Sequence, residues 1–343
     1  RDVVYQDVHG VTQVTEETST FIHAKLDDLD IELGMIDDDD KVAYNAAKQQ
    51  NGIYTSRAKL RLQFLRSVQY NPQVAARRLV SWYDAKLKLF GMRLLTEDIT
   101  MFDLCPEAQA ILSSGRVQLL PVRDSAGRPL IASLKFDADM FSTSAPAKFF
   151  FYFSMAMLDD DEATQLTGVV GIHALHSNMV DFTPAQRQNY IHSASTTDAI
   201  PVKFQGFHFI TERSMMLRRI ANLLQLSFSK ELRHRFRIHC GTFEECKYAL
   251  MSYGIPLDTL PLTDDGDIKI ASHMKWLQRR KAKDTFTVQE RHSRWGEADT
   301  AITLDSRLNA SLEINKDLLL ATVSRENEAE EYSGRGKGEQ RIQ

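Results

Sequence analysis

Apolar and polar positions change their spacing several times along the chain, and each change predicts a new element. Between residues 56 and 91 the apolar side chains recur every three or four positions, which is typical of amphipathic helices. Asn71 can cap the second of these helices, with Pro72 at its first position and Gly91 at its end. Further short helices over residues 96–114 complete a helical segment.

The pattern changes again at residue 117, where two apolar runs flank a short turn. The turn is Asp124-Ser-Ala-Gly-Arg-Pro129. Gly127 supplies the positive φ that a tight turn requires, Asp124 can bond its own backbone, and Pro129 stands where an incoming strand needs no N–H. The segment therefore predicts a β-hairpin.

After the hairpin, helical and extended patterns alternate. The aromatic-rich run Ala147–Leu158 predicts a helix that is buried on most sides, and Leu166–Leu175 predicts a central parallel strand. The remaining elements are a helix from Thr183, a strand over 204–210, helices over 212–226 and 229–233, a strand over 236–240 and a helix over 243–252. This order predicts a mixed sheet with a parallel centre and excludes an all-β or all-helical core.

Composition and charge divide the chain into five segments. At 343 residues and 43% hydrophobic it can bury one large core or two modest ones. Residues 1–50 hold 4 Lys/Arg against 12 Asp/Glu, and we expect a partly ordered lead-in with at most one short helix. The predicted segments are an acidic lead-in (1–55), a basic helical subdomain (56–114), the sheet domain (115–262), a basic helical extension (263–295) and a charged, disordered tail (296–343).

Two basic blocks stand out within a chain whose net charge is -4. Residues 51–97 hold 9 Lys/Arg against 2 Asp/Glu, and residues 201–247 hold 9 against 4. A local anionic partner such as a membrane surface fits these blocks, whereas the bulk charge does not indicate a nucleic acid partner. No apolar run approaches a membrane span and no signal-peptide core begins the chain, so we expect a cytoplasmic protein that associates reversibly with membranes. The three cysteines are too scattered for a disulfide framework or a metal site.

The hairpin, together with Leu62-Gln-Phe-Leu-Arg66 and Asn71-Pro-Gln-Val-Ala-Ala76, resembles the CRAL-TRIO lipid-binding domain family over residues 56–262. This family includes retinaldehyde-binding, tocopherol-transfer and phosphatidylinositol-transfer proteins. The resemblance implies an α/β fold, with an N-terminal helical bundle followed by a mixed, mainly parallel sheet flanked by helices. It also implies a lipid as the bound ligand, an apolar pocket for it, and a gate helix at Glu212–Leu226 that opens at a membrane.

The resemblance also implies a set of site residues. Polar and aromatic pocket residues would be Ser133, Phe149, Tyr152, Phe153 and His173. Gate residues facing the lipid tail would be Met215, Met216, Ile220 and Leu223. Residues near an anionic head group would be Lys203 and Arg235, and residues that meet the membrane would be Arg213, Arg218 and Arg219. Taken alone, the spacing favours aromatics that only fill a core and arginines that lie on a solvated face.

The head-group positions depart from the family pattern. Pro201-Val202-Lys203 stands where phosphatidylinositol-binding members carry Pro-Glu-Arg, and Gly168 and Val170 stand where phosphatidylcholine-binding members carry hydroxyl side chains. His173 replaces the usual Asp at the end of that strand. We therefore expect a hydrophobic ligand, phospholipid or isoprenoid-like, whose head group the sequence leaves open.

Two other functions stay open beside non-enzymatic lipid binding and transfer. The domain could be a protein-interaction module of the exchange-factor or GTPase-activating type, with its tails binding a protein partner. It could also be a hydrolase or transferase that uses His173 or His208, although no G-x-S-x-G, G-x-G-x-x-G or Walker A pattern is present. His173 and His176 point to opposite faces of a strand, so no metal and no cofactor other than a lipid is expected.

Overall fold

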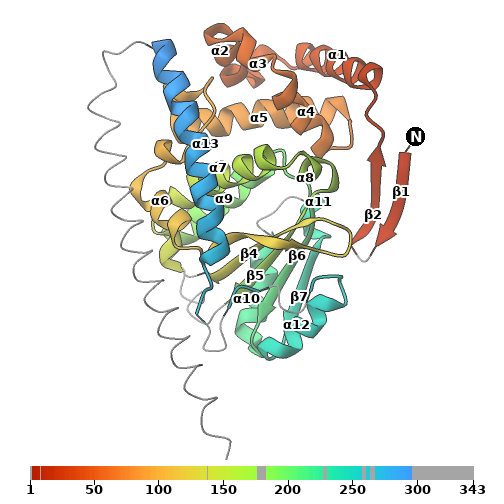
Figure 1. Ribbon diagram of the computed structural model, residues 1–343, viewed down its shortest axis with the longest axis vertical. Helices are drawn as coiled ribbons and strands as arrows, with labels where there is room; N and C mark the ends of the chain where they lie inside the picture. The colour runs from red at the N-terminus through yellow and green to blue at the C-terminus, as the bar shows by residue number, and fades with distance from the viewer. Residues whose placement is uncertain are drawn as a thin grey trace, which may run out of the picture. The chain divides into compact units, whose positions relative to one another are not determined.

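The computed structural model describes residues 2–7, 9–136, 138–175, 183–226, 230–256, 260–262 and 267–295. It divides into two compact units, residues 1–284 and residues 285–343. The first unit holds nearly all of the described elements (Figure 1). The predicted tail over 296–343 lies outside the described residues.

The helical segment forms as the apolar spacing predicts. Its helices are α4 (Ala58–Ser67), α5 (Pro72–Phe90) and α6 (Pro106–Ser113), with short 3-10 turns at Met92–Leu94 and Met101–Asp103. The Asn71 side chain accepts a hydrogen bond from the Val74 N–H, and Gly91 ends α5 with φ of 76°. Both helix signals in the sequence are therefore confirmed.

The expectation for the acidic lead-in is wrong. It forms a hairpin of β1 (Asp2–Asp7) and β2 (Gly10–Thr15), followed by α1 (Ser19–Met35), a 3-10 turn (Asp38–Asp40), α2 (Val42–Gln50) and α3 (Gly52–Thr55). Tertiary packing overrides the weak local pattern, because Leu29, Leu33 and Ala47 are buried in the same cluster as residues of α5.

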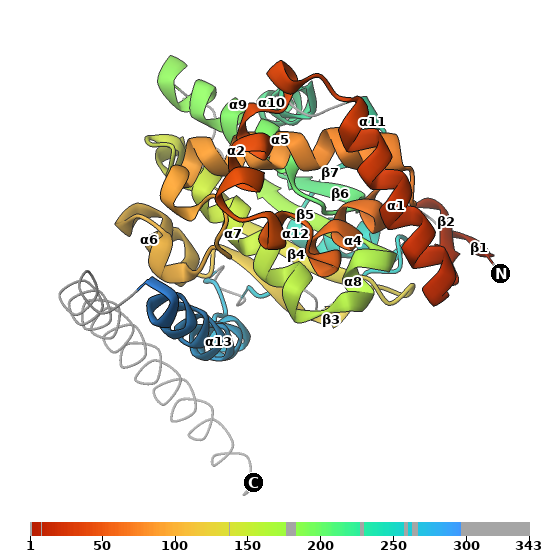
Figure 2. The ribbon, with the colours of Figure 1, turned by 90° about the horizontal axis from the view of Figure 1, so that it is seen from above.

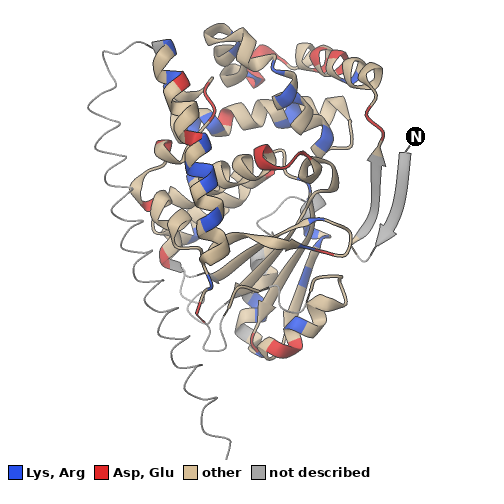
Figure 3. Cartoon of the chain, in the orientation of Figure 1, with Lys and Arg blue, Asp and Glu red and all other residues tan. Residues whose placement is uncertain are grey.

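The acidic lead-in also neutralises part of the first basic block. The buried guanidinium of Arg66 bonds both carboxylate oxygens of Glu17 at 2.7 and 2.6 Å, and Arg61 pairs with Asp30 at 2.8 Å. Figure 3 shows basic residues along α4 and α5 and acidic residues on α1. Arg61 and Arg66 of the basic block are therefore paired with acidic residues of the lead-in, inside the protein.

The sheet has the predicted mixed topology. Its order is β3 (Val117–Arg123), β4 (Pro129–Phe136), β5 (Val169–Leu175), β6 (Phe204–Thr211) and β7 (Phe236–Cys240). The first pair is antiparallel and the other three pairs are parallel. The turn between β3 and β4 has Gly127 at φ of 78°, and the Asp124 side chain accepts from the Arg128 N–H at 2.8 Å.

Helices cover both faces of this sheet. On one side are α7 (Ala145–Asp160), α8 (Glu162–Thr167) and α9 (Pro184–Ala199), and Figure 2 shows α5 and α7 crossing over the strands. On the other is α12 (Phe243–Met251). The remaining helices are α10 (Met215–Leu226), α11 (Lys230–Arg233) and α13 (Ala271–Trp295), and α13 lies within the predicted basic helical extension over 263–295.

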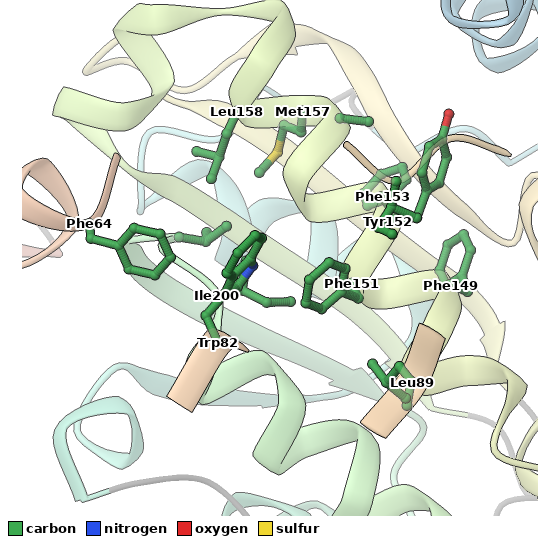
Figure 4. Packing of buried hydrophobic residues seen from close by; sticks show 14 of the residues in the cluster. Phe64, Trp82, Leu89, Phe149, Phe151, Tyr152, Phe153, Met157, Leu158 and Ile200 are labelled. Carbon is green, nitrogen blue, oxygen red and sulfur yellow. The ribbon is translucent and has the colours of Figure 1, made fainter. Parts of the chain in front are cut away.

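Two buried clusters follow from the alternation of side chains along the strands. Leu130, Ala132 and Leu134 of β4 join Cys246 and Leu250 of α12 on one face. Ile131 of β4 joins a larger cluster on the other face, which includes Trp82 stacked on Phe151 with ring centroids 5.6 Å apart (Figure 4). This cluster runs from Leu29 to Leu277, so the helical segment, the sheet and the start of α13 share one core.

A chain of histidines fastens the N-terminal hairpin to the sheet. Arg128 contacts the Nδ1 of His9 at 3.0 Å, the Nε2 atoms of His9 and His208 lie 2.9 Å apart, and the Nδ1 of His208 lies 2.9 Å from the Nε2 of His239. Arginine can only donate, so His9 must donate to His208 and His208 must donate to His239. With all three imidazole rings neutral, each hydrogen bond from Arg128 through His9 and His208 to His239 therefore has one donor and one acceptor.

Candidate functional site

An apolar cavity of about 80 Å³ lies between the sheet and the helices α7 and α9. Its described walls come from β3, β4, β5, β6, the 3-10 turn Ala138–Phe141, α7 and α9. The phenylalanine side chains that line it are Phe141, Phe150, Phe153, Phe204, Phe207 and Phe209. An engineered cavity of about 150 Å³ admits benzene, so the present volume is too small for a lipid tail without rearrangement of its walls.

Aromatic rings of β5 and β6 form the floor of this cavity, and a ring of β7 stacks against them. Phe207 stacks on Phe204 and on Phe236, with centroids 4.6 and 4.7 Å apart. His173 of β5 stacks on Phe209 at 5.1 Å. Side chains alternate between the two faces of a strand, so Phe207 and Phe209, two residues apart, point to the same face, toward α7 and α9. Phe204 joins them because the register shifts near the start of β6.

Six polar side chains interrupt the apolar lining: Ser133, Ser154, His173, Tyr190, Ser193 and Thr197. On α9, the hydroxyls of Ser193 and Thr197 donate to backbone carbonyls of their own helix, each at 3.0 Å. Ser133 and His173 differ, since neither makes a hydrogen bond with a described residue. They are also direct neighbours, because Ser133 of β4 pairs with His173 of β5 in the sheet.

His173 is neutral in this environment. Burial lowers the pKa of its imidazole from the ordinary value near 6.5 to about 4. The side chain nevertheless keeps part of its surface uncovered, which is consistent with a ring that faces a hollow instead of packed atoms.

The aromatic residues predicted for the pocket divide into two groups. Phe153 lines the cavity, and Phe149 stacks behind it with centroids 5.5 Å apart and no exposed surface. Tyr152 donates its hydroxyl to Asp284 at 2.7 Å in a buried contact with α13. Phe149 and Tyr152 are therefore core residues in this state, and α7 presents only one side to the cavity.

The segment Glu212–Leu226 contains a helix, α10, and the residues predicted there fall into three groups. Met215 is 70% exposed, and the arginines Arg218 and Arg219 are exposed as well. Arg213 is also exposed and pairs with Glu245. The side chains of Met216, Ile220 and Leu223 lie outside the described part of the structure.

The two residues predicted to meet a head group lie together at the amino-terminal edge of the parallel strands. Lys203 immediately precedes β6 and Arg235 immediately precedes β7. Burial, with the neighbouring charges of Arg235 and Arg128, lowers the pKa of Lys203 to about 8. Burial and Arg128 also lower the pKa of Arg235, which donates to Gln205 at 2.6 Å. Lys203 and Arg235, whose pKa values are both lowered beside other positive charges, form a site that favours an anion.

Several residues of this region are absent from the set that the sequence predicts. The sequence pattern assigns Arg128 only to the hairpin turn, because its place at the cationic edge depends on the sheet register. Tyr190, Ala194 and Thr197 line the cavity from α9. Residues spaced four and three positions apart lie on one face of a helix, so this spacing could have indicated that Tyr190, Ala194 and Thr197 share a surface.

The described residues that line the cavity form no catalytic triad. No hydrogen bond joins Ser133 to His173, and no described carboxylate bonds either residue, so a serine hydrolase triad is not assembled there. No group of three or more metal-binding side chains is found in the part of the chain that the structure describes. Among the same residues, no helix is both long and apolar enough to span a bilayer.

Comparisons with known proteins support no family assignment. No family model matches the chain, and no curated protein does. Among solved structures, the crystal structure of Sfh5 aligns with a TM-score of 0.41 and 9% identity, over 66% of this chain and 81% of that one. The class of the protein therefore rests on its own architecture, which is a mixed α/β fold with a five-stranded, mostly parallel sheet flanked by helices.

Proposed function

We propose that this chain binds a hydrophobic lipid without catalysing its conversion, and that it carries the lipid between membranes. The observation that supports this function is the aromatic cavity between the sheet and α7 and α9. Ligand sites for small apolar molecules are concave, mostly apolar and equipped with a few polar groups, as this one is. The CRAL-TRIO resemblance of the sequence leads to the same function independently.

The small volume of the cavity implies that binding is coupled to opening. A lipid tail gains about 0.8 kcal/mol per buried methylene, which is enough to offset the separation of packed elements when many methylenes enter. We propose that α10 is the element that moves, with Arg218 and Arg219 meeting an anionic membrane surface. A charged head group, where the lipid has one, would lie at Lys203 and Arg235.

The direct test is to extract the purified protein with organic solvent and to analyse the extract by mass spectrometry. We expect close to one lipid per chain. Ala194→Phe, which fills the cavity from α9, should abolish recovery of the lipid, whereas Ala163→Phe on the exposed side of α8 should not. Circular dichroism on both variants establishes that they are folded. Wild-type protein that yields no lipid, and takes none up from vesicles, would rule out this function.

A second candidate function rests on a different surface. Ile31, Met35, Val42 and Ile53 are each more than half exposed, on the helices α1, α2 and α3. Exposed large aliphatic side chains gathered within 23 positions favour a binding surface, and the acidic charge of this segment disfavours an anionic membrane. A protein partner is the alternative. Partner recovery that survives Ala194→Phe but is lost in Ile53→Asp would favour it.

A further inference from the structure

The cavity contains polar groups that the protein itself does not satisfy. Ser133 is 1% exposed, and its Oγ is buried with no hydrogen-bond partner among the described residues. A buried hydroxyl without a partner carries a desolvation cost, so native structures rarely keep one without a use. His173 is its neighbour across the β4 and β5 pair and makes no hydrogen bond with any described residue either.

The rest of the wall restricts what these two groups can bind. The aromatic floor offers no charge, and the hydroxyls of Ser193 and Thr197 are already used by the backbone of α9. His173 lies too deep to ionise near neutral pH, because burial lowers its pKa to about 4. None of the described residues that line the cavity is a lysine or an arginine, so a carboxylate or phosphate placed here would meet no cation in that lining.

We propose that Ser133 and His173 receive the uncharged oxygen of the ligand, a hydroxyl or a carbonyl, at the inner end of an otherwise apolar molecule. This inference rests on the proposed lipid-binding function and names the class of lipid. The ligand is a neutral amphiphile that enters with its oxygen first. The Ser133 hydroxyl donates to or accepts from that oxygen, and the imidazole of His173 completes the pair from the adjacent strand.

The experiment uses three probes of equal chain length, namely 1-dodecanol, dodecane and dodecanoate. Their affinities for the delipidated full-length protein are measured by equilibrium dialysis with labelled probes at pH 7.5. Three variants accompany the wild type: Ser133→Ala, His173→Phe, which keeps a ring between Phe207 and Phe209, and Ser81→Ala on the exposed side of α5 as the control.

We expect Ser133→Ala and His173→Phe each to weaken dodecanol about tenfold, the loss of one hydrogen bond, and to leave dodecane within about twofold. Ser81→Ala should change neither affinity. Retained dodecane binding shows that the variants are folded and that the cavity is intact.

Two results would overturn the inference while the proposed function stands. One is equal loss, or no loss, of both probes in the two variants. The other is tighter binding of dodecanoate than of dodecanol by the wild type. If the wild type binds none of the three probes and yields no lipid on extraction, the proposed function itself fails and the inference falls with it.

Discussion

At the scale of single residues, the cavity shows a conflict between stability and binding. The unpartnered Oγ of Ser133 has lost its contact with water and has gained none from a described residue. A buried polar group in this condition costs about 1–3 kcal/mol of folding stability. An alanine at the same place would remove the cost and leave the packing of β4 almost unchanged.

We therefore expect Ser133→Ala to stabilise the delipidated protein by about 1 kcal/mol, measured by urea unfolding. The gain should shrink or reverse when the wild type is measured with its lipid bound, because the ligand then satisfies the hydroxyl. Ser81→Ala serves as the control for a serine on an exposed helix surface. A destabilised Ser133→Ala variant without lipid would mean that the hydroxyl has a partner in the protein.

At the scale of elements, the histidine chain ties the β1 and β2 hairpin to β6 and β7, and its strength depends on pH. Burial, followed by the charges of His239 and His9, lowers the pKa of His208 to about 2, and burial lowers that of His239. The other groups nearby are Arg128, Asp124, Arg237, His173 and Tyr253. Protonation of His208 would replace an acceptor by a donor and would break the chain at His9 or at Arg128.

The sign of the effect follows from the lowered pKa values. Above pH 6.5 the histidines are neutral in both the folded and the unfolded chain. Below it, the unfolded chain binds protons that the folded chain excludes, so stability falls as pH decreases, by at most about 1.4 kcal/mol per pH unit for each histidine. We expect His208→Phe to flatten the dependence of unfolding free energy on pH between 6.5 and 4.5, and His23→Gln, on exposed α1, to leave it unchanged. Parallel profiles for His208→Phe and wild type would contradict this account.

The sequence predicted an element correctly where a single residue determined the local backbone geometry. Asn71 with Pro72, Gly91 and the Gly127 turn each impose a backbone geometry that tertiary contacts do not need to supply. The prediction for the lead-in was wrong because α1 has apolar residues on several sides and becomes stable only against α5, through Leu29 and Leu33. The pairing of Ser133 with His173 depends on the register between β4 and β5, which single-strand patterns do not specify.

At the scale of the whole molecule, the two basic blocks differ in how their arginines are placed. The basic block of α4 is partly neutralised by the acidic lead-in, through Arg66 with Glu17 and Arg61 with Asp30. The second block includes Arg218 and Arg219 of α10, which are exposed and have no ion pair within the described residues. The two blocks look alike in sequence, but Arg61 and Arg66 of the first are paired internally, whereas Arg218 and Arg219 of the second are exposed without an ion pair among the described residues.

Membrane binding should therefore depend on α10 more than on α5. An arginine near an anionic bilayer contributes about 1 kcal/mol, so we expect Arg218→Ala/Arg219→Ala to weaken binding to phosphatidylserine vesicles by about 2 kcal/mol, measured by co-sedimentation at low salt. The matched control is Arg77→Ala/Lys88→Ala, which removes two exposed cations from α5 and should leave binding unchanged. Because the attraction is screened, raising the salt concentration should reduce the difference between wild type and the α10 variant. Equal losses in the two double variants would show that the protein responds to its total positive charge, and the assignment of α10 as the docking element would then be wrong.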